Sequence, residues 1–339
     1  QFKGESFSRM NINQPNIFPI AVGLSFLLII LTVFVIFLAI AFFRKANENR
    51  QLYEQILATN KGLEQLVDAR TKELRLAGTA ISESIDYASR LQRNLLPPKH
   101  QLEDHLGEVA VIWQPKDVVG GDFHWFGQIG TQHVMVAMDC TGHGVPGAFM
   151  TLIAHSALEQ IQSSQNTLAE MGESNITAAG ILHMLHDNVY RMLTQSQLNR
   201  NQNGLDASVI ILSHDRKTLN FAGAHMDIYT LTPENKAMRH KGNKISLGYE
   251  TATLPPLQDI YFEVVKGQIF ALTTDGILSQ PGTEKQIGFG YQRFINTLNS
   301  AETLSPASMA KYVMRQVRAW QGKQLRRDDV MLILFQPIP

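Results

Sequence analysis

Cysteine is almost missing from this sequence, and so is an excess of charge of either sign. Cys140 is the single cysteine among 339 residues, which excludes an intramolecular disulfide and fits a reducing compartment. No activating base pattern accompanies it, so we interpret it as a small residue at the end of a buried strand rather than as a nucleophile. The 30 basic and 30 acidic side chains cancel, and no Lys/Arg-rich block occurs, which argues against a nucleic-acid-binding protein.

Charge is absent altogether from residues 17–43. These 27 residues contain no charged side chain, and they are long enough to cross a hydrocarbon layer of roughly 30 Å even when tilted. We predict a transmembrane helix, because the run is too long for a cleaved signal peptide and lacks a small-residue cleavage pattern. Arg44 and Lys45 follow at once, which places the C-terminal bulk of the chain in the cytoplasm, at the inner membrane of a bacterium.

The chain begins with Gln1 rather than Met. We therefore interpret residues 1–16 as the extracytoplasmic tail of a longer upstream region. Such a region would act as a sensor, with this chain as its output module.

Residues 44–96 are predicted to form a helical linker, in which one seven-residue register runs unbroken from Tyr53 to Leu95 and predicts a parallel coiled coil and a homodimer. Asn60, Arg70 and Ser84 are poor core residues, so the seam is marginal, and a polar seam position sets register at a cost in stability. The alternative is an amphipathic helix that packs on its own domain, above all over 81–95. Pro97 and Pro98 end the helix in either case. The two seam positions hold Tyr53, Asn60, Val67, Leu74, Ile81, Ala88 and Leu95, and Ile56, Leu63, Arg70, Ala77, Ser84 and Leu91.

Short apolar runs separated by turns begin near residue 108 and indicate strands. Longer amphipathic stretches between them indicate helices that cover sheet faces. Many strands with few, clustered helices favour an α+β fold over a parallel βαβ series. The predicted strands are 109–113, 123–128, 134–139, 207–212, 218–222, 228–231, 260–265, 269–273 and 330–335, and the predicted helices are 145–163, 178–194 and 305–320.

Four aspartates stand at or near the ends of predicted strands, namely Asp122, Asp139, Asp275 and Asp328. Carboxylates that converge without histidine or thiolate ligands are typical of magnesium and manganese sites. Glycines beside them let backbone and metal approach closely. The sequence therefore predicts metal-dependent hydrolysis.

The contexts of these aspartates resemble the PPM (PP2C-like) serine/threonine phosphatases, in particular their bacterial RsbU/SpoIIE branch. The segments are GGDF at 120–123, DCTGHGVPGA at 139–148, TTDG at 273–276 and DDVMLILF at 328–335, and they are jointly specific. The resemblance covers residues 91–336 and extends to membrane-bound phosphatases of the SiaA type. It implies a PP2C-like sandwich of two antiparallel sheets flanked by helices, in a phosphatase domain over 97–339, with metals at one end of the sandwich.

The same resemblance implies the ligand roles for two Mg²⁺ or Mn²⁺ ions. Asp139 bridges both ions and the carbonyl of Cys140 assists one of them. Asp122 holds one ion, and Asp275 with Asp328 holds the other. Two ions that activate a bridging water make a covalent enzyme intermediate unnecessary.

The function implied is dephosphorylation of a phosphoserine or phosphothreonine in a STAS (anti-anti-sigma-type) protein of a partner-switching pathway. The alternative is a non-catalytic membrane scaffold that binds such a partner, and the loss of metal-site acids would mark it. The GGDF string also invites comparison with diguanylate cyclases, but the additional acid of their signature is absent and the other segments do not match.

The sequence leaves the roles of five residues open. Asp328 is preferred over Asp329 as the ligand, although strand neighbours point to opposite faces and the sequence alone allows either. His143 is a candidate general acid or a structural loop residue. We interpret His225 as a turn or sheet-edge residue, and Asp206 as a turn residue or an accessory acid.

Overall fold

The computed structural model describes residues 18–172, 176–194, 203–232, 237–249, 254–283, 287–301 and 305–338. The chain divides into two compact units, Gln1–Ala80 and Ile81–Pro339, and each is described by itself. The expected extracytoplasmic tail, residues 1–16, lies outside the described residues, and so does Ile17.

Helix α1 (Phe18–Leu95) is continuous for 78 residues and stops two residues before Pro97, where proline was expected to end it. Within the described residues it is the one helix long and apolar enough to cross a membrane. Apolar seam residues in the first unit, such as Tyr53, Leu63 and Leu74, are more than half exposed. The predicted coiled coil and membrane span remain predictions.

Two five-stranded antiparallel sheets form the second unit, in strand order β1-β10-β9-β6-β7 and β2-β3-β4-β5-β8. The first sheet contains β1 (Glu108–Gln114), β6 (Ile228–Leu231), β7 (Ala237–His240), β9 (Ile269–Thr273) and β10 (Val330–Gln336). The second contains β2 (Asp122–Ile129), β3 (Gln132–Cys140), β4 (Leu205–Leu212), β5 (Thr218–Ala224) and β8 (Ile260–Glu263). The expected fold class is confirmed.

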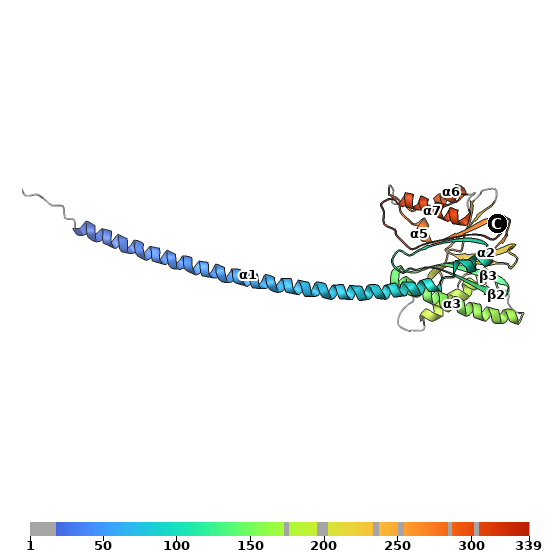
Figure 1. Ribbon diagram of the computed structural model, residues 1–339, viewed down its shortest axis with the longest axis horizontal. Helices are drawn as coiled ribbons and strands as arrows, with labels where there is room; N and C mark the ends of the chain where they lie inside the picture. Colours follow the sequence, from blue (N-terminus) through green and yellow to red (C-terminus); the bar gives the residue numbers. More distant parts are fainter. Residues whose placement is uncertain are drawn as a thin grey trace, which may run out of the picture. The chain divides into compact units, whose positions relative to one another are not determined.

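Helices cover the outer face of each sheet, as Figure 1 shows for α3 on one side and α6 and α7 on the other. Helices α3 (Gly144–Glu170) and α4 (Ala178–Thr194) pack on the β2-to-β5 face. Helices α6 (Gly290–Asn299) and α7 (Pro306–Gln321) pack on the face of β1, β10, β9 and β6. The two remaining helices are short, α2 (Lys99–Leu106) and α5 (Asp275–Leu278).

Three apolar layers result from this order. The central one lies between the sheets and includes Phe126, Phe221, Phe270 and Phe335, all buried. Most strands therefore bury both faces, which explains why strands such as β10 read as continuous apolar runs rather than as alternating ones. The edge strands β7 and β8 are exceptions and are only partly buried.

All nine predicted strands form, with ends shifted by at most two residues. Of the three predicted helices, 178–194 has the predicted bounds, 305–320 is shifted by one residue, and 145–163 extends to Glu170. The prediction missed β7, α2, α5 and α6. The strand β7 is four residues long and only partly buried, so it carries no apolar run. Helix α5 is a single turn that starts at Asp275, immediately after the strand.

Candidate active site

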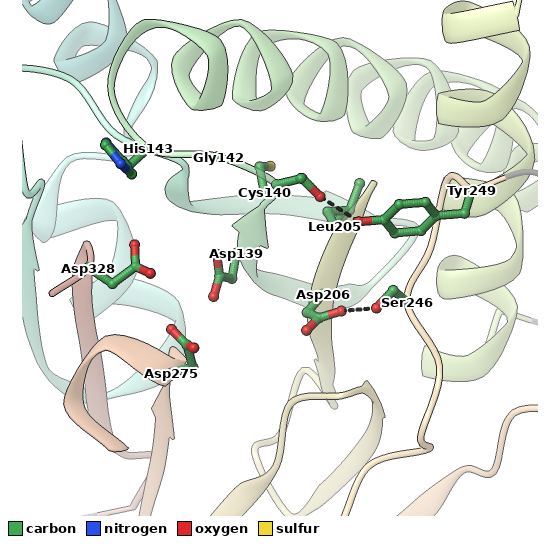
Figure 2. Close-up of a pocket in the computed structure, with 11 residues that line it drawn as sticks. Asp139, Cys140, Gly142, His143, Leu205, Asp206, Ser246, Tyr249, Asp275 and Asp328 are labelled. Carbon is green, nitrogen blue, oxygen red and sulfur yellow. Dashed lines mark hydrogen bonds between the residues drawn. The ribbon is translucent and has the colours of Figure 1, made fainter. Parts of the chain in front are cut away.

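A cavity of about 230 Å³ lies at one end of the sandwich and is lined by four carboxylates. They are Asp139 at the end of β3, Asp206 at the start of β4, Asp275 at the start of α5 and Asp328 in the segment before β10. Figure 2 shows Asp139, Asp275 and Asp328 turned toward a common space. The structure thus brings together three of the four aspartates that the sequence singled out, and adds Asp206.

Strand pairing explains how three acids come to lie side by side. Asp139 is directly opposite Asp122 on β2 and directly opposite Asp206 on β4. Residues directly opposed on neighbouring strands project from the same face of a sheet, and like charges in such pairs repel. The sheet therefore forces these carboxyl groups together at a cost in stability.

The repulsion appears in the titration of the acids. Burial, then Asp275 and Asp206, raise the pKa of Asp139 well above its usual range. Burial, then Asp328, raise the pKa of Asp275, and burial raises that of Asp206. Among the described residues that line the cavity, none is Lys or Arg. A cation from outside the chain would relieve this concentration of negative charge.

Asp122 is 1% exposed and does not line the cavity. The hydroxyl of Thr274 donates to its Oδ2 at 2.7 Å, whereas Oδ1 is buried and has no hydrogen-bond partner among the described residues. Burial, then Asp139, raise the pKa of this carboxyl well above its usual range. An orphaned carboxylate oxygen behind the cavity wall suits a cation that approaches from the cavity side.

Cys140 is buried, and burial raises the pKa of its thiol well above the usual value, so the side chain stays a neutral thiol. Its carbonyl faces Gly121, where a Cβ would come within 2.5 Å of the Cys140 oxygen and 2.6 Å of the Gly142 oxygen. Only glycine permits this approach. The local chemistry agrees with a backbone contribution from Cys140 and not with a thiol nucleophile.

The two neighbouring acids before β10 have different surroundings. Asp328 lines the cavity. Asp329 is 3% exposed and accepts the main-chain N–H groups of Lys116 at 2.5 Å and Gly121 at 2.6 Å. Asp329 therefore fastens the loop before β2, and Asp328 is left as the acid available to a metal.

The two candidate histidines lie in different places. His143 lines the cavity, and its Nδ1 is 2.8 Å from Asp117 Oδ2 in a half-exposed pair. His225 has a positive φ of 53°, as its interpretation as a turn residue implies. Its Nδ1 is 2.9 Å from Ser246 Oγ and 3.3 Å from Asp206 Oδ1, which connects it to a cavity acid.

Ser246 and Tyr249 line the cavity although sequence reasoning missed them. Ser246 donates to Asp206 at 2.5 Å (Figure 2), and the Tyr249 and Thr141 hydroxyl oxygens are 2.7 Å apart. Both missed residues belong to the irregular segment between β7 and β8. That segment has no motif or periodicity, so only the folded chain reveals its position.

The donor set fits a hard divalent ion, because every candidate group is an oxygen. Within the described residues, no three His, Cys, Asp or Glu side chains are arranged to hold an ion by themselves. Magnesium retains several waters and needs few carboxylates, so a ligand set completed by water and a backbone carbonyl is compatible with this geometry.

Comparison with known proteins gives a match to a family model and similarities to solved structures. Residues 130–337 match the family model described as stage II sporulation protein E (SpoIIE). The SiaA-PP2C domain of Pseudomonas aeruginosa is 31% identical, with a TM-score of 0.64, and the match covers 77% of this chain and 97% of that domain. The RsbU and RsbW domains of a Mycobacterium tuberculosis protein are 17% identical over 68% of this chain and 61% of theirs, with a TM-score of 0.52, which reflects the fold alone. A comparison with curated proteins gave no significant match.

Proposed function

The chain belongs to the SpoIIE family and carries a serine/threonine phosphatase domain of the PP2C type, and from this premise we propose that it is a metal-dependent phosphoprotein phosphatase. The single observation that carries the metal dependence is the cavity lined by Asp139, Asp206, Asp275 and Asp328 with no described Lys or Arg in its lining. A phosphate monoester is an anion, and it cannot enter this cavity unless cations neutralise the carboxylates.

Asp139, Asp275 and Asp328, with the Cys140 carbonyl and the buried Asp122, are the groups that would hold two Mg²⁺ or Mn²⁺ ions. When bound, such a pair supplies an activated water and neutralises the charge on the phosphoryl oxygens. The chain itself keeps the acids in place: β3 fixes Asp139 between its neighbours, and Thr274 and Ser246 orient Asp122 and Asp206.

The size of the cavity supports a protein substrate that presents one side chain. A volume of about 230 Å³ admits a phosphorylated serine or threonine but not a folded domain. The remainder of the substrate would contact the rim, which includes His143 and Tyr249. In the RsbU/SpoIIE branch that the motifs resemble, the expected substrate is a phosphorylated STAS-domain protein of a partner-switching pathway.

The setting proposed for the enzyme is the inner membrane of a bacterium, with the phosphatase domain in the cytoplasm and α1 pairing with α1 of a second copy. The exposed apolar residues of α1 between Phe18 and Phe43 support the first part. The exposed seam residues, such as Ile56, Val67 and Leu74, support the second.

The test is to assay the full chain in lipid nanodiscs on phosphopeptides and on phosphorylated STAS proteins, with and without Mn²⁺. Turnover that requires Mn²⁺ and is absent in Asp328→Asn supports the proposal, and turnover on the proteins alone shows that docking matters. Binding of a STAS protein without turnover under any metal condition would instead support the non-catalytic scaffold.

A further inference from the structure

A second cavity, of about 410 Å³, lies between α2, β1 and α7, away from the carboxylates. Its wall is mostly apolar and includes Leu102 of α2, Val109 and Trp113 of β1, and Ala310 of α7. We refer to it as the α2–β1–α7 cavity. Its lining resembles that of a small-molecule site, in which apolar side chains predominate and a few polar groups fix orientation.

One polar group of this cavity is buried and unsatisfied. His124 lines the cavity, is 3% exposed, and its Nδ1 has no hydrogen-bond partner among the described residues. A buried polar atom without a partner carries a desolvation cost, so native structures rarely leave one without a reason. A bound molecule with a hydrogen-bonding group would remove that cost.

The charged groups at this cavity are positive. Lys99 and Lys311 both line it, and both are exposed. Helix α2 begins at Lys99 with no side-chain cap and no acid in its first turn. Free N–H groups at a helix N-terminus favour an anion. The ion pair of Lys99 with Glu103, at 2.6 Å, is exposed on both sides, and such pairs contribute little.

The cavity wall is connected to the phosphatase site through two residues. The indole N–H of Trp113 donates to the main-chain carbonyl of Asp122 at 2.7 Å. His124 follows Asp122 by two residues on β2, so its side chain projects from the same face of the sheet. A molecule that presses on Trp113 therefore acts on the residue that holds the Asp122 backbone.

We propose that the α2–β1–α7 cavity is an effector site for a small anionic amphiphile. The apolar body of the ligand lies against Trp113, and its anionic group accepts a hydrogen bond from His124 and is attracted by Lys311 and the N-terminus of α2. Occupancy changes phosphatase turnover through the Trp113–Asp122 hydrogen bond. The binding part of this inference stands independently of the proposed function, and only the effect on turnover rests on it.

Binding is tested on the full chain in phosphatidylcholine nanodiscs, with hexanoate as the probe and hexylammonium as the probe of equal length and opposite charge. Ligand-observed NMR measures both, with empty nanodiscs as the blank. We expect saturable binding of hexanoate and at least tenfold weaker binding of hexylammonium. Equal binding of the two probes, or no saturable binding of hexanoate, would overturn the proposal.

Three variants locate the site. Ala307→Trp fills the mouth of the cavity from an exposed position on α7, and Lys311→Glu reverses the charge there. Lys266→Glu makes the same reversal at an exposed loop residue elsewhere and is the matched control. We expect at least a tenfold loss of hexanoate affinity in the first two and none in the third. Retained affinity in Ala307→Trp, with an unchanged melting temperature, would place the probe elsewhere and refute the site.

Two further measurements test whether ligand binding changes phosphatase turnover and whether the natural ligand is a membrane lipid or a free metabolite. Hexanoate should change turnover of a small aryl phosphate by the wild-type chain and leave Ala307→Trp unaffected. Binding without any change in turnover would overturn the link to Asp122. Nanodiscs that contain phosphatidylglycerol compete with hexanoate if the natural ligand is a membrane lipid, and do not compete if it is a free metabolite.

Discussion

The side chain of Gln92 and the main chain of Gly120 are joined by two hydrogen bonds. Gln92 Nε2 donates to the Gly120 carbonyl at 2.7 Å, and the Gly120 N–H donates to Gln92 Oε1 at 3.3 Å. Gln92 is 2% exposed and also donates to Thr151 Oγ1. The last turns of α1 are thereby fixed to the loop that ends in Asp122.

Gln92→Leu should destabilise the domain by about 1–3 kcal/mol, because it leaves the buried Gly120 N–H and carbonyl without partners. It should also lower kcat, since the loop that holds Asp122 loses one of its attachments. Chemical denaturation and steady-state kinetics measure the two effects. Asn94→Leu, at an exposed position of the same helix end, is the matched control and should change neither.

Asp328→Asn and Asp329→Asn should separate activity from stability. Asp328 lines the cavity, so Asp328→Asn should abolish turnover while the protein keeps or gains thermal stability through reduced repulsion. Asp329→Asn loses charge-assisted bonds to two N–H groups and should lower the melting temperature. An Asp329→Asn protein that is stable and inactive, beside an active Asp328→Asn protein, would show that the ligand assignment is reversed.

Turnover should require added Mg²⁺ or Mn²⁺ and should be lost in excess EDTA, because oxygen ligands give sites that chelators empty. Added Mn²⁺ should raise the melting temperature by relieving repulsion among the acids. Asp139→Ala should cost more turnover than Asp122→Ala or Asp275→Ala, since Asp139 is the proposed ligand of both ions. It should also remove most of the Mn²⁺ effect on melting. Full activity in EDTA would exclude the two-metal proposal.

Stability should fall as the pH is lowered from about 6.5 toward 4, and His133 should contribute to that loss. Burial, then His105, His214 and Arg216, lower the pKa of His133 from 6.5 to about 4. The unfolded chain therefore binds a proton in this interval that the folded chain excludes, so protonation favours unfolding. His133→Phe should reduce the difference in unfolding free energy between pH 7 and pH 5. His100→Phe, at an exposed position of α2, should leave that difference unchanged.

One residue inserted between Lys72 and Glu73 should uncouple or lock activity, because it rotates everything downstream in α1 by about 100°. A seven-residue insertion preserves the seam and should restore near-normal regulation. Activity and cross-linking in membranes are the measurements. Equal activity and regulation in the two insertions would show that α1 is a passive tether.

The sequence predicted the layers of the fold well because most of its strands are buried on both faces and read as apolar runs with clear ends. It predicted three cavity aspartates because short motifs mark them, with glycines beside Asp139 and Asp275 and a second acid followed by an apolar run after Asp328. Asp206 stayed ambiguous, since its role follows from lying opposite Asp139 on a neighbouring strand, and register is not visible in a single sequence.

The other residues that the sequence did not predict are also positioned by tertiary contacts. Ser246 and Tyr249 reach the cavity from an irregular segment, where tertiary contacts and not local periodicity decide position. The seven-residue pattern assigned 44–96 to a coiled-coil linker, with packing of 81–95 on its own domain as the alternative, and neither interpretation singled out the burial of Gln92. The structure groups Ile81–Leu95 with the phosphatase unit, as the alternative has it.

Strand β10 is the last strand of the chain, yet it lies between β1 and β9 inside its sheet, paired with β1 over seven residues. Strand β1 therefore has no partner strand in its sheet until β10 has been synthesised, and Asp328 joins the other acids only then. Contacts so distant in sequence slow folding, and β1 keeps an unpaired edge while the residues between it and β10 are synthesised. The domain should thus fold and acquire activity only once β10 has been synthesised, and loss of β10 should give an aggregating chain rather than a weakened phosphatase.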